Sequence, residues 1–250
     1  MSEDRDRLRS LVGQGAALWA GPDGVTVSPR RWIALSGAPS ADYNVAVCHG
    51  MDASPEIEAS LREIGEVGAP AVIMLAGAAL ADAQLLADAG WVCVGAVPLM
   101  ALELQSLPNR AHADARRLAP QDLPDARALV AEVFGLTPEL ASVALPESVV
   151  TAPDQWLWGI RGGSGELLSC ITLVLVGDAV VGWSLCASRV RGRGYGRLIF
   201  ASALAEAAAA GQRLALHYSS YVGAPVYRVM GFSEIERWQM WSRPRWVLRR

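Results

Sequence analysis

An internal repeat constrains the fold of this 250-residue chain more than any other feature. The six residues that begin at Ile57 match the six that begin at Ile199 at an offset of 142, and the Gly-Trp91 segment matches Gly-Phe232 at an offset of 141. In both halves the matches lie in the predicted order helix, strand, helix, glycine-aromatic pair, strand. Alanine-rich helices match easily by chance, but two matches at nearly one offset indicate tandem copies of one fold.

Hydrophobic periodicity predicts helices and strands along both halves. In the first half we expect strands at residues 44–48, 71–75 and 91–104, and helices at 56–67 and 79–89. In the second half we expect strands at residues 116–118, 156–160, 167–176, 179–187 and 213–218, and helices at 120–134, 138–150 (broken at Pro146), 197–210 and 222–230. This mixture predicts an α/β (α+β) fold in which helices cover a sheet. The best linker candidate is residues 107–113, which places a first domain at 1–107 and a second at 108–250.

Composition excludes several classes of function. Hydrophobic residues make up 52% of the chain, which is enough for a full core and excludes a disordered protein. The net charge of −3 does not favour a nucleic-acid binder, which is normally basic as a whole. The 22 basic residues are all Arg, so chemistry that needs a lysine, such as a Schiff base or a P-loop, is excluded.

No segment of the sequence predicts a membrane span or a metal site. The longest apolar run, residues 67–81, is shorter than the roughly 20 residues of a spanning helix, and the polar N-terminus shows no signal peptide. We therefore expect a cytoplasmic protein. Its cysteines are expected to be buried free thiols; they are Cys48, Cys93, Cys170 and Cys186. Its histidines are scattered, which predicts no metal; they are His49, His112 and His217.

One loop, residues 189–197 (Arg-Val-Arg-Gly-Arg-Gly-Tyr-Gly-Arg), carries the features of a phosphate site. It lies between the predicted strand 179–187 and an apolar helix, and its glycines let a ligand approach the backbone closely. The free N–H groups and positive dipole end of the helix suit a phosphate, and the arginines add charge. A solvated basic turn is the alternative. The spacing GxGxG differs from the GxGxxG of a Rossmann site, the next strand has no acidic residue, and a P-loop would need a lysine after its last glycine.

From Arg191 to Gly196 the loop reads Arg-Gly-Arg-Gly-Tyr-Gly, which resembles the R/Q-x-x-G-x-G/A pyrophosphate loop of the GNAT superfamily of acetyl-CoA-dependent N-acetyltransferases. The segment that ends at Phe232, Gly-Ala-Pro-Val-Tyr-Arg-Val-Met-Gly-Phe, is similar to the PxYxxxGF segment of that family. The resemblance covers about residues 113–245. It implies tandem GNAT-like mixed β-sheets flanked by helices, of which the C-terminal copy is complete.

The resemblance also implies where acetyl-CoA would bind. The family's sheet is splayed between the strands that correspond to residues 179–187 and 213–218, and the acyl-CoA lies between them. Its pyrophosphate would meet the loop residues Arg191, Gly192, Arg193, Gly194, Tyr195, Gly196 and Arg197. Its pantetheine would pair with backbone near Leu185 and Cys186. In the family, a tyrosine at the position of Tyr227 often protonates the departing thiolate; a core aromatic before a tight turn is the alternative.

The other candidate side chains are less specific. Ser219 and Ser220 end the predicted strand, where Ser220 would bind pantetheine or an ordered water, or would cap the following helix. A general base is not visible: His217 is one candidate, although a histidine on a buried strand is more often a core residue. Glu132 and Glu139 lie on the helices that roof the acceptor site in the family, and solvated glutamates are the alternative.

The first half lacks the residues of the site. At an offset of 142 the loop maps onto residues 49–54, His-Gly-Met-Asp-Ala-Ser, which keep one glycine and no arginine. At an offset of 141, Tyr227 maps onto Leu86. We therefore interpret residues 1–107 as a degenerate copy that binds no CoA, packs against the second copy and helps to wall the acceptor pocket. Four tryptophans would line that pocket or belong to the core; they are Trp19, Trp32, Trp156 and Trp158.

Together these features predict direct transfer of an acetyl group from acetyl-CoA to the primary amine of a small molecule. The same fold could instead act on a protein or peptide amine, or use another acyl-CoA. Outside catalysis, the alternative is a CoA-binding sensor or an inactive partner subunit, which the intact Tyr227 and loop disfavour. We expect no nucleic-acid or membrane partner, and a homodimer is one option for the assembly.

Overall fold

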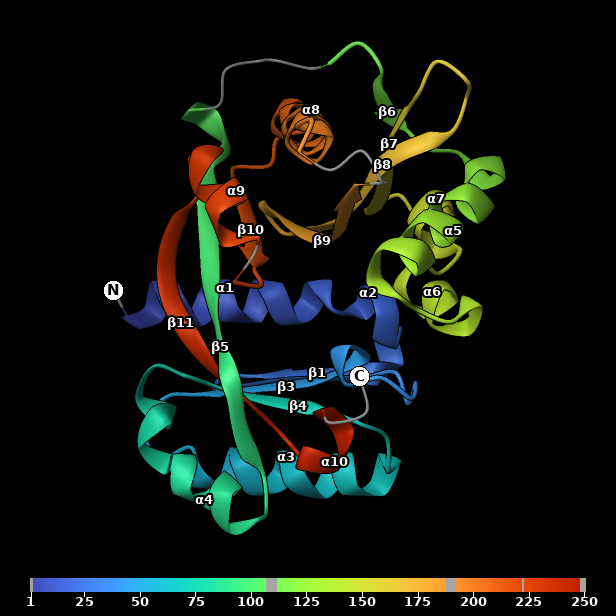
Figure 1. Ribbon diagram of the computed structural model, residues 1–250. Coiled ribbons are helices and arrows are strands. Elements are labelled where there is room, and N and C mark those ends of the chain that lie inside the picture. Colours follow the sequence, from blue (N-terminus) through green and yellow to red (C-terminus); the bar gives the residue numbers. More distant parts are fainter. Residues whose placement is uncertain (1, 107–111, 188–191, 222, 248–250) are drawn as a thin grey trace. The chain divides into compact units, whose positions relative to one another are not determined.

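A computed structural model of the chain describes residues 2–106, 112–187, 192–221 and 223–247 (Figure 1). The described residues form helices and mixed β-sheet, which confirms the α+β fold class. They divide into two compact units: unit 1 comprises residues 1–100, 218–225 and 234–250, and unit 2 comprises residues 101–217 and 226–233. The expected boundary at 107/108 refers to two copies of a fold, which is a different division from these two compact units. It stays a prediction.

In unit 1 the strands follow the order β1-β2-β3-β4-β11-β5. They are β1 (Val25–Ser28), β2 (Arg31–Leu35), β3 (Asn44–His49), β4 (Val72–Ala76), β5 (Val92–Glu103) and β11 (Ser233–Ser242). β1, β2 and β3 pair antiparallel in turn, β3 and β4 pair parallel, and β11 pairs antiparallel with β4. The last strand of the chain therefore joins the sheet that the first hundred residues build.

The helices of unit 1 include one that packs as the sequence predicts. They are α1 (Ser2–Gly15), α2 (Ala17–Ala20), α3 (Ser54–Val67), α4 (Ala83–Asp88) and α10 (Pro244–Val247), with 3-10 turns η1 (Pro22–Gly24), η2 (Ala41–Tyr43) and η3 (Gly77–Asp82). Ile57 and Ile64 of α3 are buried in one core with Leu75 of β4, and Leu61 packs against that core. Burial of this face holds α3 on the sheet, because each large apolar side chain removed from water contributes about 1.5–3 kcal/mol.

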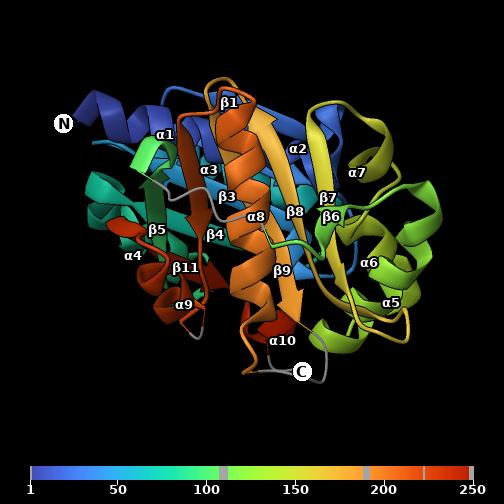
Figure 2. The ribbon, with the colours of Figure 1, turned by 90° about the horizontal axis from the view of Figure 1, so that it is seen from above.

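In unit 2 the strands follow the order β10-β9-β8-β7-β6. They are β6 (Ala115–Arg117), β7 (Gln155–Arg161), β8 (Leu167–Val176), β9 (Ala179–Ala187) and β10 (Leu214–Tyr218). β6 to β9 pair antiparallel in turn, and β9 and β10 pair parallel. The helices are α5 (Leu123–Phe134), α6 (Pro138–Ala144), α7 (Ser148–Thr151), α8 (Tyr195–Ala209) and α9 (Ala224–Val229), with 3-10 turns η4 (Leu104–Ser106) and η5 (Pro120–Asp122). The first two residues of α9 belong to unit 1. Figure 2 shows α8 lying along β9 and β8, on which it packs.

The secondary structure repeats at the offsets that the sequence indicates. Shifted by 142 residues, α3 falls on α8 and β4 falls on β10. Shifted by 141 residues, α4 falls on α9 and β5 falls on β11. Two helices and two strands in one order show that the sequence repeat reflects two copies of one arrangement of elements.

Three expectations need correction or addition. α1, β1 and β2 are not predicted from the sequence, because six of the 14 residues of α1 are charged and the two strands are short. The helix expected at residues 79–89 begins as the 3-10 turn η3, and the α-helix starts only after Asp82, whose carboxylate is held by the Ala53 N–H. Most of the linker candidate, residues 107–111, lies outside the described residues.

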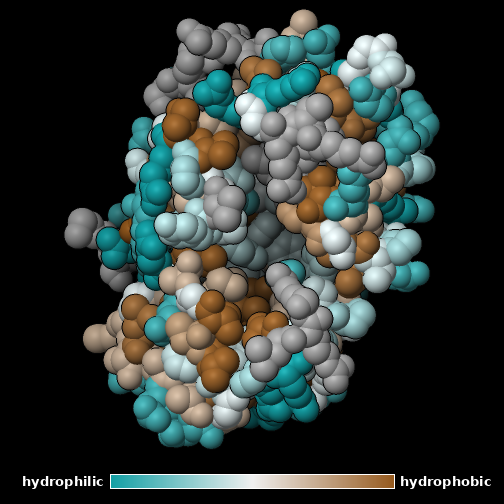
Figure 3. All heavy atoms as spheres, viewed as in Figure 1, coloured by the Kyte–Doolittle hydropathy of each residue, from teal (hydrophilic) through white to brown (hydrophobic). Residues whose placement is uncertain are grey.

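The first half of β5 is exposed although it is apolar. Val92 and Val94 are 41% and 40% exposed, and their neighbours up to Ala96 are exposed as well. Figure 3 shows brown, hydrophobic surface over this part of unit 1. Cys93 lies in this segment and is exposed for that reason, which corrects the expectation that every cysteine is buried. Cys48 and Cys170 are buried free thiols as expected.

Within the described residues, no helix has the length and apolarity needed to cross a bilayer. Over the same ranges, no group of three or more His, Cys, Asp or Glu side chains is arranged to hold a metal ion.

Candidate functional site

The loop before α8 presents open backbone. Gly192 and Gly194 have φ of +85° and +82°. This left-handed conformation costs a residue with a side chain about 1–2 kcal/mol. A Cβ placed on either glycine would meet no atom within 4 Å. Backbone conformation rather than crowding therefore calls for glycine here, and the space beside the loop is open.

The start of α8 adds unpaired backbone donors to this loop. Gly194 is the N-cap, and its carbonyl accepts the Leu198 N–H at 3.0 Å. The first N–H groups of a helix have no acceptor within the helix, so those of residues 195–197 point out of its N-terminal end. With the positive end of the helix dipole, they form a place for an anion.

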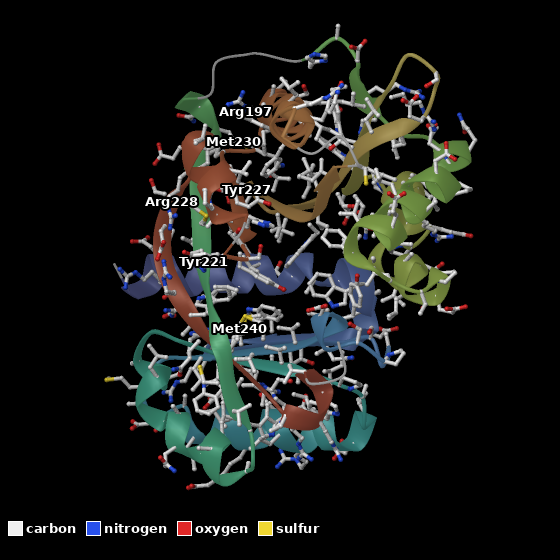
Figure 4. All side chains as sticks on the ribbon, viewed as in Figure 1. Arg197, Tyr221, Tyr227, Arg228, Met230 and Met240 are labelled. Atoms are coloured by element: carbon white, nitrogen blue, oxygen red, sulfur yellow. The ribbon has the colours of Figure 1, made fainter. Side chains whose placement is uncertain are left out.

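The charges around the loop favour an anion as well. The first turn of α8 holds no acidic residue, and Arg193 and Arg197 are exposed. Figure 4 shows Arg197 at the start of α8. Arg191, a predicted pyrophosphate contact, lies outside the described residues, as does Arg189. The described part of the loop thus brings two cations to the open backbone.

In unit 2, the ladder between β9 and β10 is short. The strands pair in parallel over three residue pairs, from Leu214↔Ala179 to Leu216↔Val181. β9 nevertheless continues beyond Val181 to Ala187. We call the stretch beyond this last pair the opening between β9 and β10. Its presence agrees with the splay that the sequence resemblance implies.

A bulge bends β9 within this opening. Thr172 lies opposite Trp183 and Cys170 lies opposite Cys186, so three steps along β9 match two along β8. The extra residue increases the local twist, which is how a sheet ends a pairing or redirects a strand. Leu185 and Cys186, the predicted pantetheine contacts, lie at this bulge, and their side chains are outside the described part of the chain.

The end of α9 places Tyr227. The Phe232 N–H donates to the Tyr227 carbonyl, and the Gly231 N–H donates to the Arg228 carbonyl, each at 3.0 Å. Gly231 has φ of +96°, so these bonds form a Schellman motif with its glycine in the left-handed region. The pattern Tyr-x-x-x-Gly-Phe is therefore a helix stop that brings the tyrosine and the phenylalanine together.

Tyr227 lies in an aromatic cluster of unit 2, and Figure 4 shows it on α9. Its ring centroid is 5.7 Å from Phe232, 5.9 Å from Phe200 of α8 and 4.4 Å from the imidazole of His217. Only 5% of the residue is exposed, and burial raises the pKa of its hydroxyl above the usual range. The phenol is therefore protonated at neutral pH.

His217 of β10 bonds to β9. Its Nδ1 is 2.7 Å from the Gly182 carbonyl oxygen, and because that oxygen can only accept, Nδ1 carries the proton. Burial lowers the pKa of His217 to about 4, which keeps the imidazole neutral at pH 7. The sequence leaves a core histidine and a general base open. The bond to Gly182 gives the side chain a structural partner, and its role as a base stays a prediction.

The two serines beyond β10, in unit 1, bond to nearby backbone. Ser220 Oγ accepts the Gly223 N–H at 3.2 Å, and its carbonyl accepts the Ala224 N–H at 3.0 Å, so Ser220 caps the start of α9. Ser219 is buried and donates to the Ser220 carbonyl at 2.9 Å. Capping is thus the alternative that the geometry supports for Ser220, and its contact with pantetheine stays a prediction.

The remaining candidates do not join this cluster. Glu132 on α5 and Glu139 on α6 are exposed, as the alternative of solvated glutamates requires. The four tryptophans considered for an acceptor pocket are all buried, which is the core role; they are Trp19, Trp32, Trp156 and Trp158.

Two residues that shape the site are not found by sequence reasoning. A Cβ on Gly182 would lie only 3.2 Å from Cζ of Phe200. Glycine at this position therefore lets the Phe200 ring, and with it the Tyr227 cluster, approach β9. The available signal is a glycine inside an otherwise apolar strand, which marks a bulge or a close approach.

The first copy keeps the backbone of the loop but changes its chemistry. Gly50, at the offset position of Gly192, has φ of +90°. Asp52, at the position of Gly194, has φ of +53° and is the one non-glycine residue with positive φ in the described ranges. A carboxylate thus replaces the bare backbone of the second copy, and it repels a phosphate.

A carboxylate already bonds the start of α3. Asp82 Oδ2 accepts the N–H of Ala53, the N-cap of α3, at 2.8 Å. An internal anion therefore takes one of the donors that the second copy leaves open at α8.

The first copy also keeps the helix stop and loses the phenol. The Trp91 N–H donates to the Leu86 carbonyl at 2.9 Å, and Gly90 has φ of +78°, as in the motif around Tyr227. Leu86, at the offset position of Tyr227, is fully buried. These differences favour the interpretation that residues 1–107 bind no CoA, which stays a prediction.

Solved structures with this architecture are known. The chain is similar to a GCN5-related N-acetyltransferase from Kribbella flavida with a TM-score of 0.67 and 18% identity, over 97% of this chain and 95% of that chain. For a GCN5-related N-acetyltransferase from Sphaerobacter thermophilus the TM-score is 0.63 and the identity 16%, over 95% and 91% of the two chains. For a tandem GNAT protein from the clavulanic acid biosynthesis pathway they are 0.58 and 14%, over 91% and 85%. No family model and no curated protein sequence matches the chain. These likenesses confirm the GNAT fold.

Proposed function

From the GNAT fold of this chain, we propose that it is an N-acetyltransferase that moves an acetyl group from acetyl-CoA to the primary amine of a small molecule. One observation carries the proposal. Unit 2 combines a helix start with open backbone beside two glycines of positive φ, a β9–β10 ladder that ends early and a buried, protonated tyrosine. A GNAT fold that had lost its chemistry would have no need to keep all three.

The residues of unit 2 fit the parts of CoA. The pyrophosphate would bind the N–H groups at the start of α8, where Gly192 and Gly194 leave the approach open. Arg193 and Arg197 would neutralise its charge, together with Arg191. The pantetheine would run along β9 beside Leu185 and Cys186, where the ladder to β10 has ended.

The chemistry of the step requires a proton donor at the sulfur. When bound, acetyl-CoA supplies a thioester whose C–S bond breaks as the amine nitrogen bonds to the carbonyl carbon. The O–H of Tyr227 would protonate the departing thiolate, for which a buried phenol with a raised pKa is in the correct state. The amine gives up one proton as the amide forms, and that proton restores the phenol through solvent.

Two alternatives use the same site. A protein or peptide amine, or another acyl group, would need only a different acceptor or acyl pocket, and the exposed Arg228 beside Tyr227 does not choose between them. A CoA-binding sensor would need the loop but not the phenol, so the retained Tyr227 favours an enzyme. The expected homodimer stays a prediction that light scattering of the purified chain would test.

A thiol-release assay tests the proposal. The chain is incubated with acetyl-CoA and a panel of aminoglycosides, polyamines, amino acids and peptides, and free CoA thiol is measured against time. We expect amine-dependent release with at least one small molecule, and greatly reduced release by Tyr227→Phe. Release with peptides alone would favour the protein-amine alternative, and CoA binding without any release would favour the sensor.

A further inference from the structure

We propose that His217 is a positioning residue that keeps β9 and β10 apart, by binding the Gly182 carbonyl at the point where their ladder ends. The inference rests on the proposed function, because the opening between β9 and β10 is where the pantetheine would lie. It concerns a side chain for which the sequence leaves only a core role or a general base open.

The ladder stops one residue before His217. Leu216↔Val181 is the last pair, and one further step would set His217 opposite Gly182. The imidazole Nδ1–H reaches the Gly182 oxygen instead, at 2.7 Å. Because a side chain of β10 reaches this oxygen, the carbonyl is directed toward β10. The His217 side chain therefore donates to the Gly182 carbonyl, which would accept a backbone N–H of β10 if the parallel ladder continued.

The first copy provides the comparison within the same chain. At an offset of 142, His217 corresponds to Leu75 of β4. The parallel ladder between β3 and β4 runs through Cys48↔Leu75 and on to His49↔Ala76. Pairing thus continues past Leu75, which has no donor in its side chain, and it stops before His217, which has one. The two copies differ in the way that the inference requires.

The same imidazole supports the ring of Tyr227. Their ring centroids are 4.4 Å apart. Gly182, which accepts the bond from His217, lies close to the ring of Phe200. His217 therefore links the edge of β9 to the aromatic cluster that holds the phenol. Loss of the bond would change the width of the opening and the support of Tyr227 together.

Three variants separate the bond from the ring. His217→Leu installs the residue of the first copy and removes the donor. His217→Asn keeps a donor, because the Asn Nδ2 lies at nearly the position of Nδ1 in the imidazole. His112→Leu makes the same replacement at a histidine of unit 2 whose imidazole bonds to its near neighbour Asp114. Each is made in the full chain and compared with the parent.

Two measurements are made on each variant. Amide hydrogen exchange without cofactor reports pairing at residues 182–184 and 217–218. In His217→Leu we expect exchange there to slow by about tenfold or more, and the CoA affinity measured by calorimetry to fall by about tenfold or more, as for one strong hydrogen bond. In His217→Asn and His112→Leu, the exchange rates and the CoA affinity should both stay within about threefold of the parent, which is less than the change expected from loss of such a hydrogen bond. A His217→Leu protein with unchanged exchange and affinity would overturn the inference.

Other outcomes also decide. If His217→Asn binds CoA as poorly as His217→Leu while its exchange matches the parent, the Nε2 atom and not the Gly182 bond matters, and the inference is wrong. If His217→Leu does not fold, imidazole 15N NMR of the parent decides, with a proton expected on Nδ1 and a proton on Nε2 contradicting the bond. Hydrogen exchange and NMR need no cofactor. A parent protein that binds no CoA would therefore refute the proposed function, and these two measurements would still decide whether His217 keeps β9 and β10 apart.

Discussion

Gly194→Ala separates the backbone role of the loop from its ligand role. The added Cβ would meet no atom within 4 Å, so the folding cost is that of a side chain at φ of +82°, about 1–2 kcal/mol. For a chain of this size that cost lowers the melting temperature by about 2–8 °C. The same Cβ enters the space where the pyrophosphate would bind. Loss of one hydrogen bond to a charged group should weaken CoA binding by about tenfold to a hundredfold.

Gly211→Ala is the matched control. Gly211 follows α8 at its other end, has φ of +95°, and a Cβ there would also meet no atom within 4 Å. Both variants should therefore lose similar thermal stability, and only Gly194→Ala should lose CoA affinity in calorimetric titration. Equal affinity in the two variants would refute the placement of the pyrophosphate at the start of α8.

Three further predictions concern other parts of the molecule. Tyr227→Phe keeps the ring, so CoA affinity should change little while kcat falls by about 10²–10⁴-fold; a kcat within about threefold of the parent would remove Tyr227 as the acid. Arg9→Met should destabilise unit 1 by about 3–5 kcal/mol in urea unfolding, because Glu236, which accepts the Arg9 Nε–H at 2.7 Å, is nearly buried. Adding Glu236→Gln should recover much of that loss, and no recovery would show that the charge is not its cause. Burial holds the pKa of His217 near 4 in the folded chain, whereas the value in the unfolded chain is about 6.5. As the pH falls from about 6.5 to 4, the unfolded state binds this proton and the folded state does not, so the free energy of unfolding decreases over that range. Urea unfolding at several pH values should show that His217→Asn loses this part of the decrease, and an unchanged slope would contradict the assignment.

Periodicity predicts the elements whose burial is one-sided or complete. The hairpin 167–176 and 179–187 has the bounds that its apolar runs and Gly-Asp turn indicate. The helix face of Ile57 and Ile64 is buried as expected. α1 is not predicted because six of its 14 residues are charged and its contacts are with β1 and β2, which are themselves too short to show a clear period.

The glycine and aromatic motifs predict the main parts of the site, because each records a local backbone requirement. The left-handed Gly194 and the Schellman glycine Gly231 are visible as letters in the sequence. The bond between His217 and Gly182 is not, because it joins two residues that are 35 apart in the sequence and depends on where the ladder between their strands ends. The carboxylate of Asp82 at the start of α3 is hidden for the same reason: only the folded chain brings it to Ala53.

A crystal structure of the chain with acetyl-CoA at saturating concentration would show whether the cofactor binds beside α8. We expect one cofactor per chain, with its pyrophosphate within hydrogen-bond distance of the backbone N–H groups at residues 192–197 and its thioester sulfur near the hydroxyl of Tyr227. We expect no cofactor at the turn of Gly50 and Asp52, where a carboxylate replaces the open backbone. A cofactor bound at that turn, or no cofactor beside α8, would show that the proposed CoA site is wrong.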